Sequence, residues 1–321
     1  MEKDIKQLLE SAENIALFGH KNPDGDCIGS LLGFGKLLEK MGKRVSYFTP
    51  TLPSRIYDFL PEIKKISSVF DYKNYDLLVF LDFSEMTRID SFYNGDTKYF
   101  DEHQVIVIDH HVYKDNKKNR KVITDDTAMS ACEIIFEHTY KRWPDLYDAQ
   151  IATCLYLGLT TDSGNFRYDE DHKRILTNAL RLVELGANKK RIVDNAFRKK
   201  SFAGVKMMQL MFKRLQKKGE LIYTRYTDKD LKKLNIDREE ADFGQIIIQD
   251  IDEAKVTIIF RNDEENKKCC MSLRSKHADV QKIAKSFGGG GHMHAAGCTV
   301  IRSGSFQQQV DEISTKIASM M

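Results

Sequence analysis

The chain has 321 residues, of which 41% are hydrophobic and 30% charged, and its formal net charge at pH 7 is +3. This length predicts two domains that can each bury a core, and this composition is typical of a soluble globular protein. The weak basic excess argues against a protein that grips long duplex nucleic acid by its phosphates. No segment has the ~20 apolar residues of a membrane span.

The N-terminus and the cysteines indicate where the protein works. The first residues carry mixed charge and lack the apolar core of a signal peptide, so we expect a cytoplasmic protein with no membrane partner. The cysteines are scattered, without the paired spacing of a zinc site or a disulfide framework. We therefore expect reduced thiols.

From residue 14 to about residue 185, short apolar runs alternate with segments of helical periodicity. Strands are predicted at 14–19, 44–48, 77–81 and 105–108, and helices at 27–41, 129–141, 149–159 and 173–185. This alternation predicts an α/β fold with an open parallel sheet. Ligands of such sheets bind at the carboxyl ends of the strands.

The second half of the chain differs in composition and in the order of its predicted elements. Residues 186–218 are rich in Lys and Arg and have helical periodicity, which predicts a helical linker with a solvated charged face and methionines in its core stripe. Beyond it, strands are predicted at 220–226, 255–261, 269–274 and 298–301, and helices at 239–249, 279–285 and 305–320. The predicted organisation is a larger domain over 1–185, the linker over 186–218 and a smaller α/β domain over 219–321.

Acidic and imidazole side chains follow several of the predicted N-terminal strands. They are His20, Asp24 and Asp26 after the first strand, Asp82 after the third, and Asp109, His110 and His111 after the fourth. Any one of the aspartates, taken singly, is better explained as a turn residue or a helix cap. Coincidental capping is a poor explanation for several segments that deliver such residues to one edge of a sheet, which instead indicates a metal site.

Asp162 adds a further carboxylate at the end of the helix that starts near residue 149, just before Gly164. Together the candidate ligands exceed the needs of one ion. Two divalent ions ~3.5–4 Å apart are a common device for phosphoester hydrolysis. Mixed His and Asp ligands favour Mn²⁺ over Mg²⁺.

A run of glycines, residues 288–291, precedes His292 in the smaller domain. Such a run lets a backbone approach an anion closely and present its N–H groups, with His292 as an added donor. A flexible loop is the alternative. The pair Arg274 and Ser275, on a predicted strand, favours a nucleotide or phosphate pocket.

These motifs, in this order, resemble those of the DHH phosphoesterase superfamily. The first four are His20-x-Asn22-Pro23-Asp24-x-Asp26, Asp82, Asp109-His110-His111 and Thr161-Asp162-Ser163-Gly164. The fifth, Gly288-Gly289-Gly290-Gly291-His292-x-x-Ala295-Ala296-Gly297, resembles the signature of the DHH-associated C-terminal domain. The resemblance spans nearly the whole chain, and the ordered combination is highly specific.

The resemblance implies a role for each site residue. One ion would be bound by His20, Asp24 and Asp82, and a second by Asp26, Asp82, His110 and Asp162. The resemblance also implies that His111 faces the scissile phosphate as a catalytic residue and that Asp109 orients the neighbouring imidazole. The substrate nucleotide would be held by Arg274, Ser275, Gly290, Gly291 and His292.

Within the superfamily, the two-domain plan resembles the nanoRNase and pAp phosphatase branch. The resemblance therefore implies a phosphodiesterase that degrades short RNA or DNA oligonucleotides to mononucleotides and removes the 3′ phosphate of 3′-phosphoadenosine 5′-phosphate (pAp). One alternative is a phosphodiesterase for cyclic di-AMP or its linear product pApA. Another is a non-catalytic nucleotide-binding regulatory module, against which the complete ligand set argues. A homodimer is implied by the resemblance alone.

Overall fold

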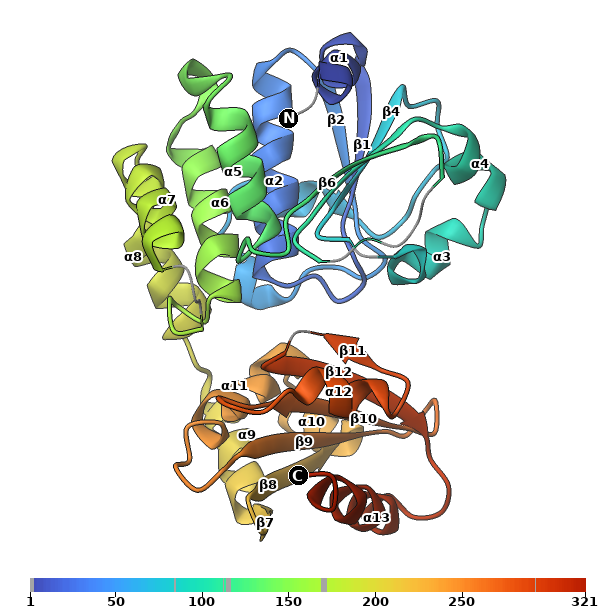
Figure 1. Cartoon of the computed structure of the whole chain (residues 1–321), viewed down its shortest axis with the longest axis vertical. Coiled ribbons are helices and arrows are strands. Elements are labelled where there is room, and N and C mark those ends of the chain that lie inside the picture. Colours follow the sequence, from blue (N-terminus) through green and yellow to red (C-terminus); the bar gives the residue numbers. More distant parts are fainter. Residues whose placement is uncertain (1–2, 84, 112, 114–116, 169–171, 292) are drawn as a thin grey trace. The chain divides into compact units, whose positions relative to one another are not determined.

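The structure, a computed structural model, describes residues 3–321 except residues 84, 112, 114–116, 169–171 and 292. The chain forms two compact units, Met1–Lys199 and Lys200–Met321 (Figure 1). The boundary between the units falls inside the segment 186–218, where the sequence predicts a linker.

The first unit is built on a six-stranded sheet with the order β3-β2-β1-β4-β5-β6, in which every pair is parallel. The strands are β1 (Asn14–Phe18), β2 (Arg44–Phe48), β3 (Ile66–Ser67), β4 (Leu77–Leu81), β5 (Val105–Asp109) and β6 (Arg120–Thr124). The predicted α/β class and open parallel sheet are confirmed. The strands missed from the sequence lie at the two edges, where β3 has only 2 residues and β6 is partly exposed.

Helices cover both faces of this sheet (Figure 1). The α-helices are α1 (Lys3–Ser11), α2 (Gly25–Lys40), α3 (Asp90–Tyr93), α4 (Thr97–Glu102), α5 (Ala131–Tyr140), α6 (Ala149–Asp162), α7 (His172–Glu184) and α8 (Lys189–Ile192). The short helical turns are η1 (Arg55–Tyr57), η2 (Ile63–Lys65), η3 (Met86–Ile89), η4 (Pro144–Leu146) and the π-helical η5 (Val193–Phe197). A mainly aliphatic core lies between one sheet face and α2, α5 and α6, and a core rich in phenylalanine lies on the other face with α3 and α4.

The contact between α2 and α6 is unusually close because glycines line it. A Cβ on Gly29 of α2 would collide with the backbone carbonyl oxygen of Cys154 in α6. A Cβ on Gly158 of α6 would lie 2.5 Å from Asp26 Oδ1. The missing side chains thus let the start of α2, which carries Asp26, approach the end of α6, which carries Asp162.

The strand order places an opening at the carboxyl ends of β1 and β4. From β1 the chain proceeds to β2 and β3 on one side of the sheet, then returns to β4 on the other side of β1. The connections on the two sides diverge at this point, which is where open α/β sheets bind ligands. His20 follows β1 and Asp82 follows β4.

The second unit contains a mixed six-stranded sheet with the order β11-β12-β10-β9-β8-β7. Its strands are β7 (Gln216–Lys218), β8 (Leu221–Thr227), β9 (Val256–Asp263), β10 (Lys268–Arg274), β11 (Gly290–Gly291) and β12 (Ala295–Ile301). Its helices are α9 (Phe202–Lys213), α10 (Asp228–Leu234), α11 (Arg238–Ile248), α12 (Val280–Lys285) and α13 (Phe306–Ala318). Among the strands that the structure describes, only β8 and β9 pair in parallel, and separate apolar clusters fill the two faces.

Two details of the predicted linker differ in the structure. Helix was predicted up to Lys218, but Gln216–Lys218 pair with β8 as an antiparallel hairpin through Gly219, whose φ of +61° suits a tight turn. The expected core stripe includes Met211, which is fully buried, but also Val205 and Phe212, which are 46% and 39% exposed. Met207 is fully buried, so a methionine does line the core.

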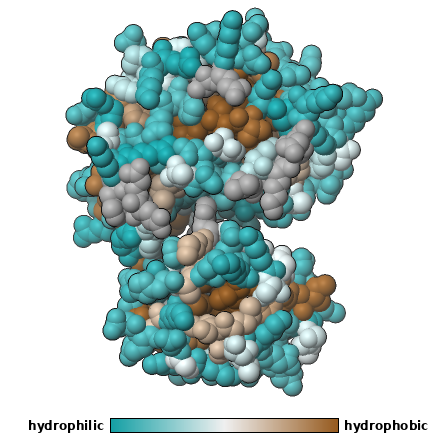
Figure 2. Space-filling view, viewed as in Figure 1, coloured by the Kyte–Doolittle hydropathy of each residue, from teal (hydrophilic) through white to brown (hydrophobic). Residues whose placement is uncertain are grey.

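The visible surface of both units is mostly hydrophilic, with hydrophobic residues showing in patches (Figure 2). In the part of the chain that the structure describes, no helix combines the length and the apolar character needed to cross a bilayer.

Replacing Gly29 by Ala tests the close helix contact. Alanine stabilises an isolated helix by about 1 kcal/mol relative to glycine, but overpacking a core costs about 1–3 kcal/mol. Because a backbone carbonyl cannot rotate away from the new methyl group, we expect Gly29→Ala to lower the free energy of unfolding by about 1–2 kcal/mol in urea titrations followed by circular dichroism.

Gly33→Ala is the matched control on the same helix. Its Cβ would meet the side chain of Leu155 at 2.8 Å, and that side chain can change rotamer. We expect a change of less than about 1 kcal/mol, in line with a tolerated core adjustment. Equal effects of the two substitutions would contradict the proposed role of the Gly29 contact.

Candidate metal centre

The first group of donor atoms lies at the ends of β1 and β4. Nε2 of His20 lies 3.1 Å from Asp82 Oδ2 and 3.8 Å from Asp24 Oδ2. Nδ1 of His20 lies 2.8 Å from the carbonyl oxygen of Lys21, which turns Nε2 toward the carboxylates. His20 and Asp82 are buried. The turn after β1 and the end of β4 thus direct nitrogen and oxygen donors at one point.

The second group surrounds His110, which follows β5. Nε2 of His110 lies 3.6 Å from Asp82 Oδ1, 3.5 Å from Asp162 Oδ2 and 4.0 Å from Asp26 Oδ2. Asp82 therefore contacts one imidazole with each of its carboxylate oxygens. A carboxylate in this position can bridge two ions.

Asp26 is held by the N-terminus of α5, which the sequence reasoning missed. The backbone N–H groups of Ala131 and Cys132 donate to Asp26 Oδ2 and Oδ1 at 2.7 and 2.9 Å. Ser130 caps this helix by accepting a hydrogen bond from the Glu133 N–H at 3.1 Å. The sequence Ser130-Ala131-Cys132-Glu133 is a typical helix start and predicts N–H donors that have no partner within the helix, but it does not predict that Asp26 accepts from them.

Asp109 supports His111. Its Oδ1 lies 2.8 Å from His111 Nδ1 and also accepts a hydrogen bond from the His111 N–H at 3.1 Å. Asp109 is fully buried, and its Oδ2 has no hydrogen-bond partner among the described residues. The contact at Nδ1 places the proton on that nitrogen and fixes the orientation of the ring.

The backbone at Asp82 is strained. Its φ is +53°, in the left-handed region that residues other than glycine rarely occupy. Its N–H donates to the carbonyl oxygen of Ile108 at 3.0 Å, which ties it to β5. Such strain persists only where the surroundings enforce it, and it is concentrated at functional sites.

The electrostatic field at the two buried imidazoles is strongly negative. Burial lowers the pKa of His20, but Asp24 and Asp82 outweigh burial and raise it to about 10. Burial likewise lowers the pKa of His110, but Asp82 and Asp162 raise it to about 10. The site thus attracts positive charge, here in the form of protons.

The pKa values of the carboxylates are shifted by the same burial and the same neighbouring charges. Burial, followed by the charge of Asp82, raises the pKa of Asp26 to about 7. Burial and the charge of Asp26 raise the pKa of Asp162 well above its usual range. Burial opposes the charge on Asp82 as well, but contacts with His110 and His20 hold its pKa well below the usual range.

The donor set fits divalent cations. Three groups each have ligand atoms within 4.8 Å of one another: Asp82, Asp109, His110 and His111; His20, Cys27 and Asp82; and Asp26, His110 and Asp162. Carboxylate oxygens with imidazole nitrogens suit first-row transition metals such as Mn²⁺. Burial and nearby carboxylates raise the pKa of Cys27 well above its usual range, so this thiol stays protonated and packs.

In the second unit, several residues predicted to bind substrate lie at one end of the sheet. Arg274 pairs with Ala295, while Gly290 and Gly291 form the edge strand β11 beside β12. Hydrogen bonds from its own turn engage the Ser275 hydroxyl, which donates to the Lys255 carbonyl at 2.6 Å. His292, also predicted to bind substrate, lies outside the described residues.

Only the last two residues of the glycine run, Gly290 and Gly291, form an edge strand, while Gly288 lies in the turn after α12. A Cβ on Gly291 would lie 2.6 Å from both the Ala295 carbonyl oxygen and the Ala296 Cα. Gly291 also has a φ of +133°, which side chains rarely adopt. Glycine is thus required for the close approach of β11 to β12.

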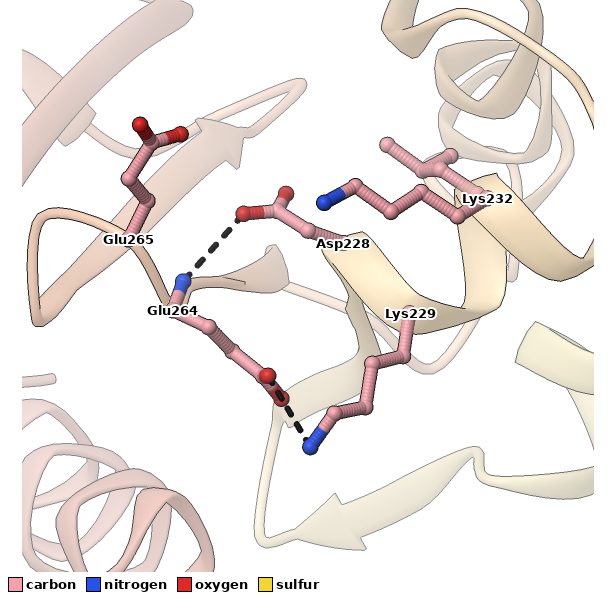
Figure 3. Close-up of a pocket in the computed structure, with 6 residues that line it drawn as sticks. Asp228, Lys229, Lys232, Glu264 and Glu265 are labelled. Atoms are coloured by element: carbon pink, nitrogen blue, oxygen red, sulfur yellow. Dashed lines mark hydrogen bonds and ion pairs between the residues drawn. The ribbon is translucent and has the colours of Figure 1, made fainter.

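A separate pocket of about 260 Å³ lies in the second unit (Figure 3). It is lined by Asp228, Lys229, Leu231, Lys232, Glu264 and Glu265. Lys229 Nζ lies 3.0 Å from Glu264 Oε2, and the Glu264 N–H donates to Asp228 Oδ2 at 3.2 Å. Lys229 and Glu264 therefore balance each other's charge. The imidazole and carboxylate cluster of the first unit is the better candidate for a functional site.

Comparisons with known proteins give a consistent result. A protein of Mycoplasma genitalium named bifunctional oligoribonuclease and PAP phosphatase NrnA is 26% identical over 310 residues, which cover 96% of this chain and 95% of the relative. A protein of the same name from Thermus thermophilus is 29% identical over 302 residues, covering 92% and 87%.

The fold and the domain matches agree with the motifs. An exopolyphosphatase-related protein from Bacteroides fragilis has a similar structure, with a TM-score of 0.87 at 22% identity, covering 99% of this chain and 96% of that one. The DHH family, N-terminal domain, matches residues 14–159, and the DHHA1 domain matches residues 227–321. The resemblance inferred from the motifs is confirmed, and the chain belongs to the DHH phosphoesterase family, with a DHHA1 domain following its DHH domain.

Proposed function

We propose that this protein is a metal-dependent phosphodiesterase that hydrolyses short oligonucleotides to mononucleotides and removes the 3′ phosphate of pAp. The observation that carries the proposal is the convergence of buried His and Asp donors around Asp82. Relatives named for both activities match this chain over almost their full length, which supports the choice of substrate.

We assign the donors to two divalent ions, most simply Mn²⁺. His20, Asp24 and Asp82 would hold one ion, and Asp26, Asp82, His110 and Asp162 the other. The contact of each Asp82 oxygen with a different imidazole supports a bridging role for this residue. When bound, such a pair supplies a water nucleophile at neutral pH and stabilises charge on the phosphoryl oxygens.

His111 is the candidate catalytic residue. Asp109 contacts the Nδ1 of His111 and thereby orients the imidazole ring. The His111 side chain is 29% exposed, so we place it at the edge of the site. An imidazole so placed can donate a proton to the leaving oxygen or stabilise charge on the phosphate. Asp109 acts through His111 and is a positioning residue.

We propose that the second unit contributes to nucleotide binding. Arg274 offers a guanidinium for phosphate, and the edge strand of Gly290 and Gly291, on the other side of β12, offers backbone groups. We propose the same role for Ser275 and His292. A cytoplasmic location and a homodimer stay predictions from the sequence.

Product analysis of purified protein tests the function. We expect Mn²⁺-dependent conversion of RNA dinucleotides to mononucleotides and of pAp to AMP, and slower or no turnover of cyclic di-AMP and pyrophosphate. Preferential cleavage of cyclic di-AMP or pApA would favour the cyclic dinucleotide reading. Nucleotide binding without turnover of any substrate would favour a regulatory module.

Asp82→Asn is expected to lower kcat/KM for the dinucleotide by more than about 100-fold. Loss of a partner that only supports a metal ligand typically costs about 10–100-fold, and Asp82 contacts both imidazoles. The matched control is Asp126→Asn, an exposed aspartate on the turn after β6, which should leave kcat/KM unchanged. Activity retained in a folded Asp82→Asn protein would exclude the assignment.

Mn²⁺ binding should release protons, and its affinity should rise between pH 6 and pH 8. Metal ligands bind in their deprotonated forms, while the raised pKa values of His20 and Asp26 keep these groups protonated near neutral pH. Falling pH therefore adds competing protons. Calorimetric titrations in buffers of different ionisation enthalpy measure the release, and an affinity independent of pH would contradict the prediction.

A further inference from the structure

A strained turn follows Asp162 directly. The successive residues Gly164, Asn165 and Phe166 all have φ values in the left-handed region, at +57°, +62° and +63°. Glycine tolerates this conformation, but for a bulky residue such as phenylalanine it costs about 1–3 kcal/mol. A turn of this kind persists only where the surrounding contacts enforce it.

Those contacts anchor the turn to the end of α6. The Ser163 hydroxyl accepts a hydrogen bond from the Phe166 N–H at 2.9 Å and donates to the Leu159 carbonyl at 2.8 Å. The Asn165 N–H donates to the Thr160 carbonyl at 2.7 Å. The Phe166 ring packs edge-on against Tyr156, with centroids 6.3 Å apart.

The turn folds Arg167 and Tyr168 back against the residue next to Asp162. The N–H groups of Arg167 and Tyr168 donate to the Ser163 carbonyl at 2.8 and 3.1 Å. Asp162 itself lies in the donor cluster, 3.5 Å from His110. The hydrogen bonds therefore hold the backbone of Arg167 and Tyr168 next to Ser163, the residue that directly follows Asp162.

Arg167 and Tyr168 form one composite surface there. The guanidinium carbon of Arg167 lies 5.4 Å from the Tyr168 ring centroid, and its Nη2 lies 3.4 Å from the Tyr168 hydroxyl. The Arg167 Nε donates to the Gly164 carbonyl at 2.8 Å, and the Tyr168 ring lies against Gly164 on one side. Tyr168 is nevertheless 43% exposed.

We propose that Tyr168, braced by Arg167, is a stacking platform for a nucleobase of the substrate, next to the metal centre. A planar aromatic ring beside a guanidinium is the surface on which single-stranded bases stack, and it accepts any base because every base has a π-face. Arg167 adds positive charge for the adjoining phosphate. The turn ties the platform to the end of α6, which carries Asp162.

The inference rests on the proposed function and adds a base-binding site in the first unit, apart from the residues assigned to the second. It also gives the strained turn a purpose. If the chain continued from Asp162 without this turn, Arg167 and Tyr168 would lie farther from the end of α6. The left-handed turn instead returns them to the carbonyl of Ser163, next to Asp162.

The test compares Tyr168→Ala and Tyr168→Phe on an RNA dinucleotide and on an abasic dinucleotide with the same backbone. Loss of one stacked base should raise KM of Tyr168→Ala for the dinucleotide about 5- to 150-fold with little change in kcat. Tyr168→Phe keeps the ring and should stay within about 3-fold of wild type. Turnover of the abasic substrate should be unchanged in both variants.

The outcomes separate this proposal from the proposed function. If wild-type protein cleaves neither substrate, the proposed function fails. If wild type cleaves the dinucleotide and Tyr168→Ala has an unchanged KM, only the platform fails. An equal loss of Tyr168→Ala on both substrates would mean a structural role and would also overturn the platform.

A binding measurement avoids dependence on turnover. The chain has one tryptophan, Trp143, so a Trp143→Phe, Tyr168→Trp protein carries its only indole on the platform. Titration with AMP in Mg²⁺ should quench its fluorescence, and ribose 5-phosphate, which lacks a base, should not. Equal responses to the two ligands, or no response to AMP in a variant that still cleaves the dinucleotide, would overturn the proposal.

Discussion

The close contact of α2 with α6 is the constraint on which the metal centre depends. Gly29 and Gly158 let the two helix backbones meet without intervening side chains, which sets Asp26 beside the end of α6. The N-terminus of α5 then holds the Asp26 carboxylate through two backbone N–H groups. Larger residues at these glycines would separate Asp26 from Asp162, and the second group of donors around His110 would lose its geometry.

The site concentrates like charges at a cost that a bound cation would offset. Several carboxylates lie within a buried region where each raises the proton affinity of its neighbours, and protons on His20 and His110 partly balance them. Backbone strain at Asp82, and again in the turn of Asn165 and Phe166, lies in the same region. The site thus lowers the stability of the fold in the region where the chemistry needs a fixed arrangement of donors, as at many functional sites.

Much of the fold and most of the candidate ligands follow from patterns along the chain. The apolar runs at 77–81 and 105–108 are buried on both faces, as their composition predicts, and Asp82 and Asp109 stand at or just after their ends. The edge strands were missed because β3 is too short to show a pattern and β7 is wholly exposed. Hairpin pairing through Gly219, rather than local preference, makes Gln216–Lys218 a strand.

The sequence by itself determined which residue types end the strands, and hence the family and the class of chemistry, because strand and helix periods are local properties. Only the tertiary structure decided which donors meet. The two hydrogen bonds from the start of α5 to Asp26 span separations of 105 and 106 positions along the chain. The two oxygens of Asp82 contact imidazoles that follow different strands. The return of Tyr168 to the carbonyl of Ser163 likewise depends on a left-handed turn that no local preference of Phe166 would favour.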